Sequence, residues 1–139
     1  MQKGSAAAQQ IKRLAGSAKG TVSVWELDLL QRTSIEAFAE RASRLPRLDR
    51  VLLNAGLAKM KFETVNGIEE MTAVGVYGTF YLLALLMPTL RKSRGVTGRV
   101  STVTVVSSDL HRNAAFAERR EEPLLASLND KSKARMLDR

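Results

Sequence analysis

Three short runs rich in valine, leucine and threonine recur along the chain, and polar or small residues follow each one. The runs are TVSVWELDL (21–29), DRVLLNAG (49–56) and RVSTVTVVSS (99–108). Such runs are typical of β-strands. The unbroken apolarity of the second indicates a strand covered on both faces, as in a parallel sheet. Because segments of helical length separate the runs, this alternation constrains the fold more than any other feature.

Helical patterns precede each run. Residues 1–14 are rich in Ala, Gln and Lys and end at the turn sequence AGSAKG. Residues 33–45 carry apolar side chains at helical spacing, start with a capping-box pattern of Thr33 and Glu36, and stop before a proline. A third helix is predicted over 68–92, with Pro88 bending it or ending it early.

Helices that alternate with strands predict the α/β class, with right-handed βαβ units on a parallel sheet. We therefore expect a partial Rossmann-like, doubly wound parallel sheet of three strands. At 139 residues, the chain has the length of a single domain, here an incomplete one spanning residues 1–139.

Composition excludes several kinds of site. The chain has no cysteine and one histidine, His111, so disulfides, a thiolate nucleophile and a zinc site built on several imidazoles are excluded. The net charge is +8, but the 22 Lys and Arg are spread along the chain among 14 acids, without interleaved stacking aromatics. This favours a mixed solvated surface over a nucleic-acid interface.

The sequence also carries information on location. The N-terminus lacks the apolar core of a signal peptide. The longest apolar segment, residues 74–87, is shorter than the roughly 20 residues of a membrane span and is interpreted as a buried helix. We therefore expect a cytoplasmic protein with no membrane and no nucleic-acid partner.

Polar side chains stand at the end of each predicted strand. In parallel α/β sheets, ligands bind beyond the carboxyl ends of the strands. Asp28, Asn54 and the pair Ser107 and Ser108 occupy these ends. Asp28 has two equally weighted interpretations: it contacts a ligand, or it caps the turn before the next helix, as strand-end aspartates also do. Asn-Ala-Gly can likewise be a simple turn.

The three strand ends together resemble the middle of a short-chain dehydrogenase/reductase, particularly the fungal and retinol-dehydrogenase-like branch. The quoted marks are LDL (27–29), NAG (54–56) and VVSSDLH (105–111), separated by distances usual for that family. The resemblance implies an oxidoreductase that transfers hydride between NAD(P) and a small-molecule carbonyl or alcohol substrate, in fungal secondary metabolism. NADP is the favoured cofactor because of the basic surplus, with NAD as the other choice.

The resemblance also implies roles for individual residues. Asp28 and the amide of Leu29 would contact adenine. Asn54, Ala55 and Gly56 would lie under the adenosine ribose, and Ser108 would hydrogen-bond the substrate oxygen. Ser107 would face the structure, and no metal is implied. A hydrolase pairing of Ser108 with His111 is disfavoured because the glycine-flanked nucleophile elbow is absent.

The sequence departs from the family pattern in three places. No Tyr-x-x-x-Lys follows the serines, and no Thr-Gly-x-x-x-Gly-x-Gly phosphate loop precedes the first strand. Gly75 stands where the family usually has an asparagine that holds a helix kink. The three predicted strands correspond to strands 3, 4 and 5 of the family's sheet order 3-2-1-4-5. The first would therefore stand about 14 Å from the second, because strands 2 and 1 between them are missing. We therefore expect a truncated chain, marginally stable and without turnover.

Two further functions remain open. One is a non-catalytic interaction protein that binds a full-length relative, or a second copy, through the apolar helix at 68–92. The other is an anion-binding or nucleic-acid-binding remnant driven by the +8 charge, whose affinity would fall steeply with salt.

Overall fold

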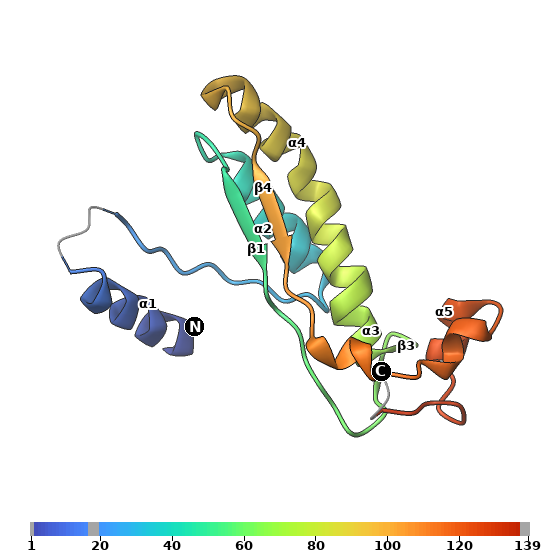
Figure 1. The fold of residues 1–139 in the computed structure, drawn as a ribbon. Helices are drawn as coiled ribbons and strands as arrows, with labels where there is room; N and C mark the ends of the chain where they lie inside the picture. Colours follow the sequence, from blue (N-terminus) through green and yellow to red (C-terminus); the bar gives the residue numbers. More distant parts are fainter. Residues whose placement is uncertain (1, 17–19, 137–139) are drawn as a thin grey trace.

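The fold is known from a computed structural model, which describes residues 2–16 and 20–136 (Figure 1). In chain order, its elements are α1 (Gln2–Leu14), α2 (Arg32–Ser43), β1 (Arg50–Leu53), β2 (Thr64–Val65), β3 (Ile68–Glu69), α3 (Glu70–Thr72), the π-helix η1 (Ala73–Gly78), α4 (Thr79–Thr97), β4 (Thr102–Val105), the 3₁₀ helices η2 (Asp109–Arg112) and η3 (Ala117–Arg120), and α5 (Leu124–Leu128). The α/β class predicted from the sequence is confirmed.

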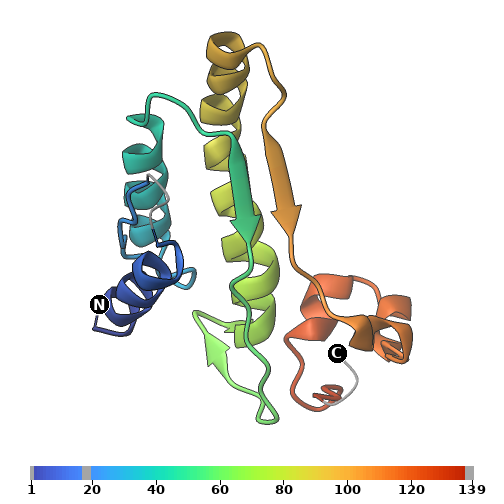
Figure 2. The same ribbon diagram turned by 60° about the vertical axis from the view of Figure 1, so that its left-hand side comes forward.

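The central sheet consists of β1 and β4, which pair in parallel with Leu53 opposite Val105. The chain between them crosses over through α3, η1 and α4. Val51 and Val103 pack against the helices, whereas Leu52 on the other face is 66% exposed. The prediction that β1 is covered on both faces is therefore wrong for this chain. No helix in the described residues lies over the second face (Figures 1 and 2).

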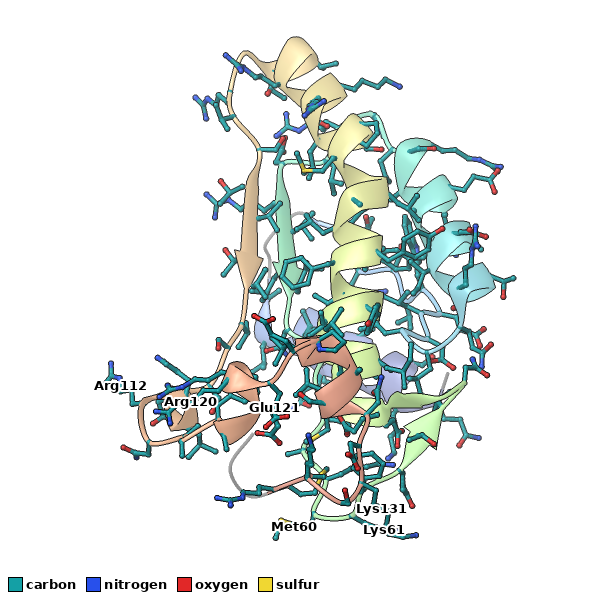
Figure 3. All side chains as sticks on the ribbon, turned by 90° about the vertical axis from the view of Figure 1, so that its right-hand side faces the viewer. Met60, Lys61, Arg112, Arg120, Glu121 and Lys131 are labelled. Atoms are coloured by element: carbon teal, nitrogen blue, oxygen red, sulfur yellow. The ribbon has the colours of Figure 1, made fainter. Side chains whose placement is uncertain are left out.

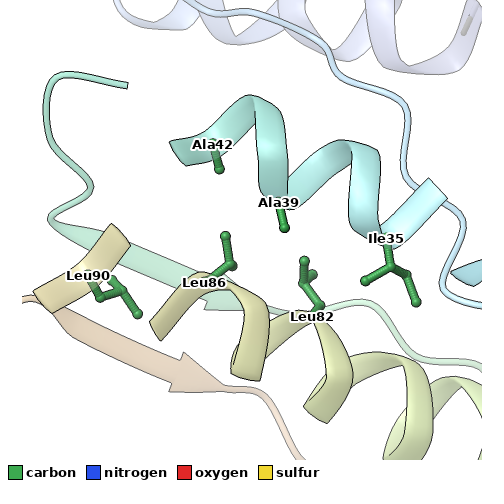
Figure 4. Close-up of a cluster of buried hydrophobic side chains, with 6 residues drawn as sticks. All are labelled: Ile35, Ala39, Ala42, Leu82, Leu86 and Leu90. Carbon is green, nitrogen blue, oxygen red and sulfur yellow. The ribbon is translucent and has the colours of Figure 1, made fainter. Parts of the chain in front are cut away.

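The hydrophobic core lies between α2 and α4 (Figure 4). Its buried side chains come from facing stripes at helical spacing, namely Ile35, Ala39, Ala42, Leu82, Leu86 and Leu90. Small alanines on α2 face leucines on α4, so the two helices approach closely. The predicted capping box is not formed, because Gln31 is the N-cap residue and makes no side-chain cap bond.

The predicted first strand is extended but has no strand partner among the described residues. A β-strand needs a neighbouring strand to pair with, and residues 2–16 and 20–136 provide none for residues 20–28. The alternation of side chains is as expected: Trp25 and Leu27 pack on the core, while Val24 faces α1 beside Gly4. The sheet thus has two strands where three were expected, with an unpaired extended segment in place of the third.

The long helix runs without interruption from Glu70 to Thr97. Pro88 lies inside α4 and does not end it. The next two residues, Thr89 and Leu90, are still buried in the core. By length and composition, residues 70–97 could cross a membrane, but the helix is the central helix of the core, as the interpretation of a buried helix expected. Between α3 and α4 it is a π-helix, and the Thr79 hydroxyl just after it donates to the Val74 carbonyl at 2.8 Å.

A short hairpin of β2 and β3 precedes this helix and turns at Asn66 and Gly67, both with positive φ. Glu69, buried at its end, accepts hydrogen bonds from the amides of Met71 and Thr72 and so caps the helix.

Nearby, the Lys59 ammonium lies 2.6 Å from the Glu63 carboxylate. Hydrogen bonds from Lys59 and, to a smaller extent, Lys61 lower the pKa of the Glu63 carboxyl to about 2.

Candidate functional site

The carboxyl ends of β1 and β4 place two of the predicted site segments side by side. The amide of Val106 donates to the Leu53 carbonyl at 2.9 Å, which extends the ladder one residue past the strands. Asn54 and Ser107 are therefore the first polar residues beyond neighbouring strand ends. Both are exposed, as are the residues that follow each of them. The exposure of Ser107 differs from the expectation that it faces the structure.

Ser108 is exposed, and its side chain also caps a helix. Its hydroxyl oxygen accepts a hydrogen bond from the Leu110 amide at 3.2 Å and caps η2. The Nδ1 atom of His111 contacts the Ser108 carbonyl oxygen and not its hydroxyl. The geometry therefore gives no support to a serine–histidine hydrolase pair.

Asp28 lies in the turn before α2. Its Oδ1 atom accepts from the Leu30 amide at 2.9 Å, and its own amide donates to the Ser34 hydroxyl at 2.9 Å. This is the turn-capping arrangement that the sequence allowed. The carboxylate remains exposed, so capping and ligand contact are compatible. The turn lies at the same end of the molecule as the tips of β1 and β4 (Figures 1 and 2).

Leu29 faces a different space from its neighbour Asp28. It lines a cavity of about 380 Å³, whose walls include Leu29, Leu30, Val65, Ile68, Tyr77 and Tyr81. A Cβ built on Gly78 would lie 2.2 Å from the Leu29 carbonyl oxygen, so only glycine lets η1 approach this turn. No sequence pattern indicates this cavity, although Asn66-Gly67 is a hairpin signal that could have located one wall.

Tyr81, one of the two tyrosines of the chain, is not an activated proton donor. The Tyr81 hydroxyl donates to the Glu36 carboxylate at 2.6 Å, and this bond raises the pKa of Tyr81. The same bond, helped by Arg32 at 2.8 Å, lowers the pKa of Glu36. A raised pKa is the reverse of the shift that a neighbouring lysine would produce.

No group of three or more His, Cys, Asp or Glu side chains in residues 2–16 and 20–136 is placed to hold a metal ion. A parallel strand pair joined by a helical crossover, with polar residues at the strand tips, defines a Rossmann-like α/β protein.

Comparisons with known proteins agree with this class. The family model for short chain dehydrogenases matches residues 1–117. The short chain dehydrogenase FGM9 of Gibberella zeae is 42% identical over 130 residues, which is 93% of this chain and 38% of that protein. The short chain dehydrogenase sol3 of Alternaria solani is 38% identical over 138 residues, covering 99% of this chain and 48% of that protein. The chain belongs to the short-chain dehydrogenase family.

A crystal structure of an uncharacterized protein from Mycobacterium paratuberculosis has a similar fold, with a TM-score of 0.57 at 23% identity. The alignment covers 94% of this chain and 43% of that chain. The chain thus spans less than half the length of these relatives, so the activity of a whole family member is a proposal for it.

Proposed function

We propose that this chain is part of an NAD(P)-binding Rossmann-like domain, within residues 1–139, of an oxidoreductase that moves hydride between the nicotinamide and a small carbonyl or alcohol substrate. The observation that carries the proposal is the parallel pairing of β1 and β4, which brings the segments that begin at Asn54 and Ser107 to the same edge of the sheet. Family membership supports the reaction class. A place for this reaction in fungal secondary metabolism is part of the same proposal, and FGM9 and sol3 come from fungi.

The residues present fit the adenosine part of a dinucleotide. Asp28 offers an exposed carboxylate for the adenine amino group, and Leu29 supplies the adjacent amide. Nothing lies within 4 Å of a Cβ built on Gly56, so ligand can approach the segment from Asn54 to Gly56. The sequence has no glycine-rich loop for the pyrophosphate. The cofactor, NADP or NAD, is therefore matched at one end only.

The catalytic assignment is limited to Ser108, whose exposed hydroxyl would hydrogen-bond the substrate oxygen. Tyr-x-x-x-Lys is absent from the sequence, and the pKa of Tyr81 is raised, whereas a tyrosine that transfers a proton needs a lowered pKa. The 139-residue chain alone is therefore expected to show no turnover. Steady oxidation of NADPH by the purified chain would contradict this expectation.

Binding of the adenosine part tests the assignment without requiring turnover. We expect AMP to shift the amide NMR signals of residues 28–30 and 54–56. In Asp28→Asn, the side-chain oxygen still accepts from Leu30, so the turn is kept. The amide nitrogen would face the adenine amino group, donor against donor, and AMP binding should be lost.

The matched control is Asp49→Asn, which makes the same chemical change before the start of β1, at the end of the strand away from Asn54. This variant should bind AMP as the original chain does. Equal AMP binding by Asp28→Asn and the original chain would refute the adenine assignment. So would signal shifts confined to residues elsewhere.

A second function is supported by a specific surface. Val76, Phe80 and Met87 lie on one face of the long helix and are 43%, 55% and 38% exposed. This apolar face fits a non-catalytic role in which the helix at 68–92 binds a full-length relative or a second copy. Co-purification with an intact relative, abolished by Phe80→Glu, would favour this function. A strictly monomeric chain that captures no relative would argue against it.

A further inference from the structure

Positive charge gathers at the end of the molecule opposite the candidate site. Residues 40–50 and 91–99 contain eight Lys or Arg and two acids, so they carry a net +6 of the chain's +8. These segments are far apart in the sequence, and folding brings them together. The Leu48 amide donates to the Ser93 hydroxyl at 2.6 Å, and the Ser101 hydroxyl donates to the Leu48 carbonyl at 2.8 Å.

Six exposed cations in these two segments have no acidic partner within the described residues. One of them, Arg41, lies 4.2 Å from the centre of the Trp25 ring, and the other five form one surface. We call this surface the basic end, and its members are Arg50, Arg91, Lys92, Arg94 and Arg99. The turn from α2 to β1 and the turn from α4 to β4 meet there (Figures 1 and 2). At the other end charges are mixed: Lys61, Lys131 and Glu121 all project there (Figure 3), and ion pairs join Lys61 to Glu63 and Lys133 to Glu121.

Helix capping does not account for the whole surface. A cation in the last turn of α4 is favourable beside the negative end of the helix dipole, which explains Arg94. Arg50 begins a strand, and Arg91 and Lys92 precede the last turn of α4, so the dipole does not account for these three. Like charges held together without partners repel one another, and a negatively charged surface would relieve the repulsion.

Two exposed valines stand among these cations. Val96 and Val100 are 65% and 76% exposed on either side of the turn that ends α4 at Gly98. No aromatic side chain lies in residues 40–50 or 91–101, and the neighbouring Trp25 already packs against Arg41 and Phe38, so these segments lack the stacking surface that single-stranded nucleic acid requires. Cations interleaved with small apolar side chains match a bilayer surface, where cations meet anionic headgroups and apolar groups enter the interface.

We propose that the basic end binds the surface of a membrane rich in anionic lipid, such as phosphatidylserine. Since β1 and β4 run away from the basic end, docking would leave Asn54 and Ser107 facing the solution. The sequence-based expectation of no membrane partner rested on the lack of a spanning segment, whereas this contact needs none. Anionic lipid is characteristic of the cytoplasmic leaflet, which fits the expected cytoplasmic location.

The test is flotation of the 139-residue chain with phosphatidylcholine vesicles, with and without phosphatidylserine. Arg91→Gln with Arg94→Gln should weaken binding to phosphatidylserine vesicles by about fivefold for each cation removed. Lys12→Gln with Arg13→Gln, which removes the same charge from α1, is the matched control and should bind as the original chain does. Circular dichroism spectra of both variants check that the fold is retained.

The valines are tested separately. Val96→Ser with Val100→Ser should weaken vesicle binding severalfold while leaving its salt dependence unchanged, because no charge is removed. Several results would overturn the proposal: no binding to phosphatidylserine vesicles at low salt, equal weakening by the α1 control, or tighter binding to a single-stranded oligonucleotide than to vesicles. Binding that resists high salt would also overturn it and would indicate insertion of the helix at 70–97.

Discussion

The contact of Gly78 with the Leu29 turn makes a quantitative prediction. In Gly78→Ala, the new methyl group would lie 2.2 Å from the Leu29 carbonyl oxygen, against about 3.3 Å for an ordinary carbon–oxygen contact. Both atoms belong to or adjoin backbone, so the turn or the helix must move by about 1 Å. Overpacking of this kind typically costs about 1–3 kcal/mol.

Gly75→Ala is the matched control, one turn earlier in the same helix, with nothing within 4 Å of the new methyl group. Both variants gain the roughly 1 kcal/mol helix preference of alanine over glycine, so this gain cancels between them. The difference in the free energy of unfolding between the two variants is then the overpacking cost, about 1–3 kcal/mol. Gly75→Ala should exceed the original chain in stability, and Gly78→Ala should fall below Gly75→Ala.

Urea unfolding followed by circular dichroism measures this difference, and limited proteolysis under native conditions should rank the variants in the same order. Amide NMR signals of residues 28–30 should move in Gly78→Ala and stay in place in Gly75→Ala. Equal unfolding midpoints for the two variants would show that η1 does not pack on the turn as described.

Three other predictions concern the core and its ion pairs. Leu86→Ala should destabilise the fold by about 3 kcal/mol, because the residue is 2% exposed, whereas Leu52→Ala should cost less than about 0.5 kcal/mol in urea unfolding. Tyr81→Phe should raise the pKa of Glu36 toward its ordinary range in an NMR titration, and an unchanged pKa would rule out the hydrogen bond. The pKa of Glu63 is about 2 in the folded chain against an ordinary 4.5, so its stabilising effect is present above pH 4.5 and is lost toward pH 2. Glu63→Gln should therefore flatten the pH dependence of the melting temperature across that interval, and identical pH profiles would contradict the ion pair.

Local patterns predicted most of the elements. Alanine-rich and apolar periodicities located α1 and α2, and the valine-rich runs located β1 and β4. The ends of β1 and β4 were also placed correctly relative to each other, because parallel pairing follows from alternation of strands with helices. What periodicity cannot supply is a pairing partner, which is why residues 20–28 are extended but unpaired.

The errors have identifiable physical causes. The capping box failed because Glu36 binds Arg32 and Tyr81 in preference to the helix N-terminus. Pro88 did not end the helix, because burial of the following turn holds α4 together. The hairpin at Asn66-Gly67 has a strong turn signal but no recognisable strand pattern, since only two residues pair on each side. The site roles of Asp28 and Ser108 stay predictions.

The turn after residue 28 connects two separate spaces through one piece of backbone. Asp28 reaches solution on one side, and Leu29 forms part of a cavity wall on the other. Because Gly78 holds the Leu29 carbonyl in close contact, this backbone cannot yield on one side without shifting on the other. A molecule that entered the cavity would therefore press on the same stretch of backbone that carries the Asp28 carboxylate.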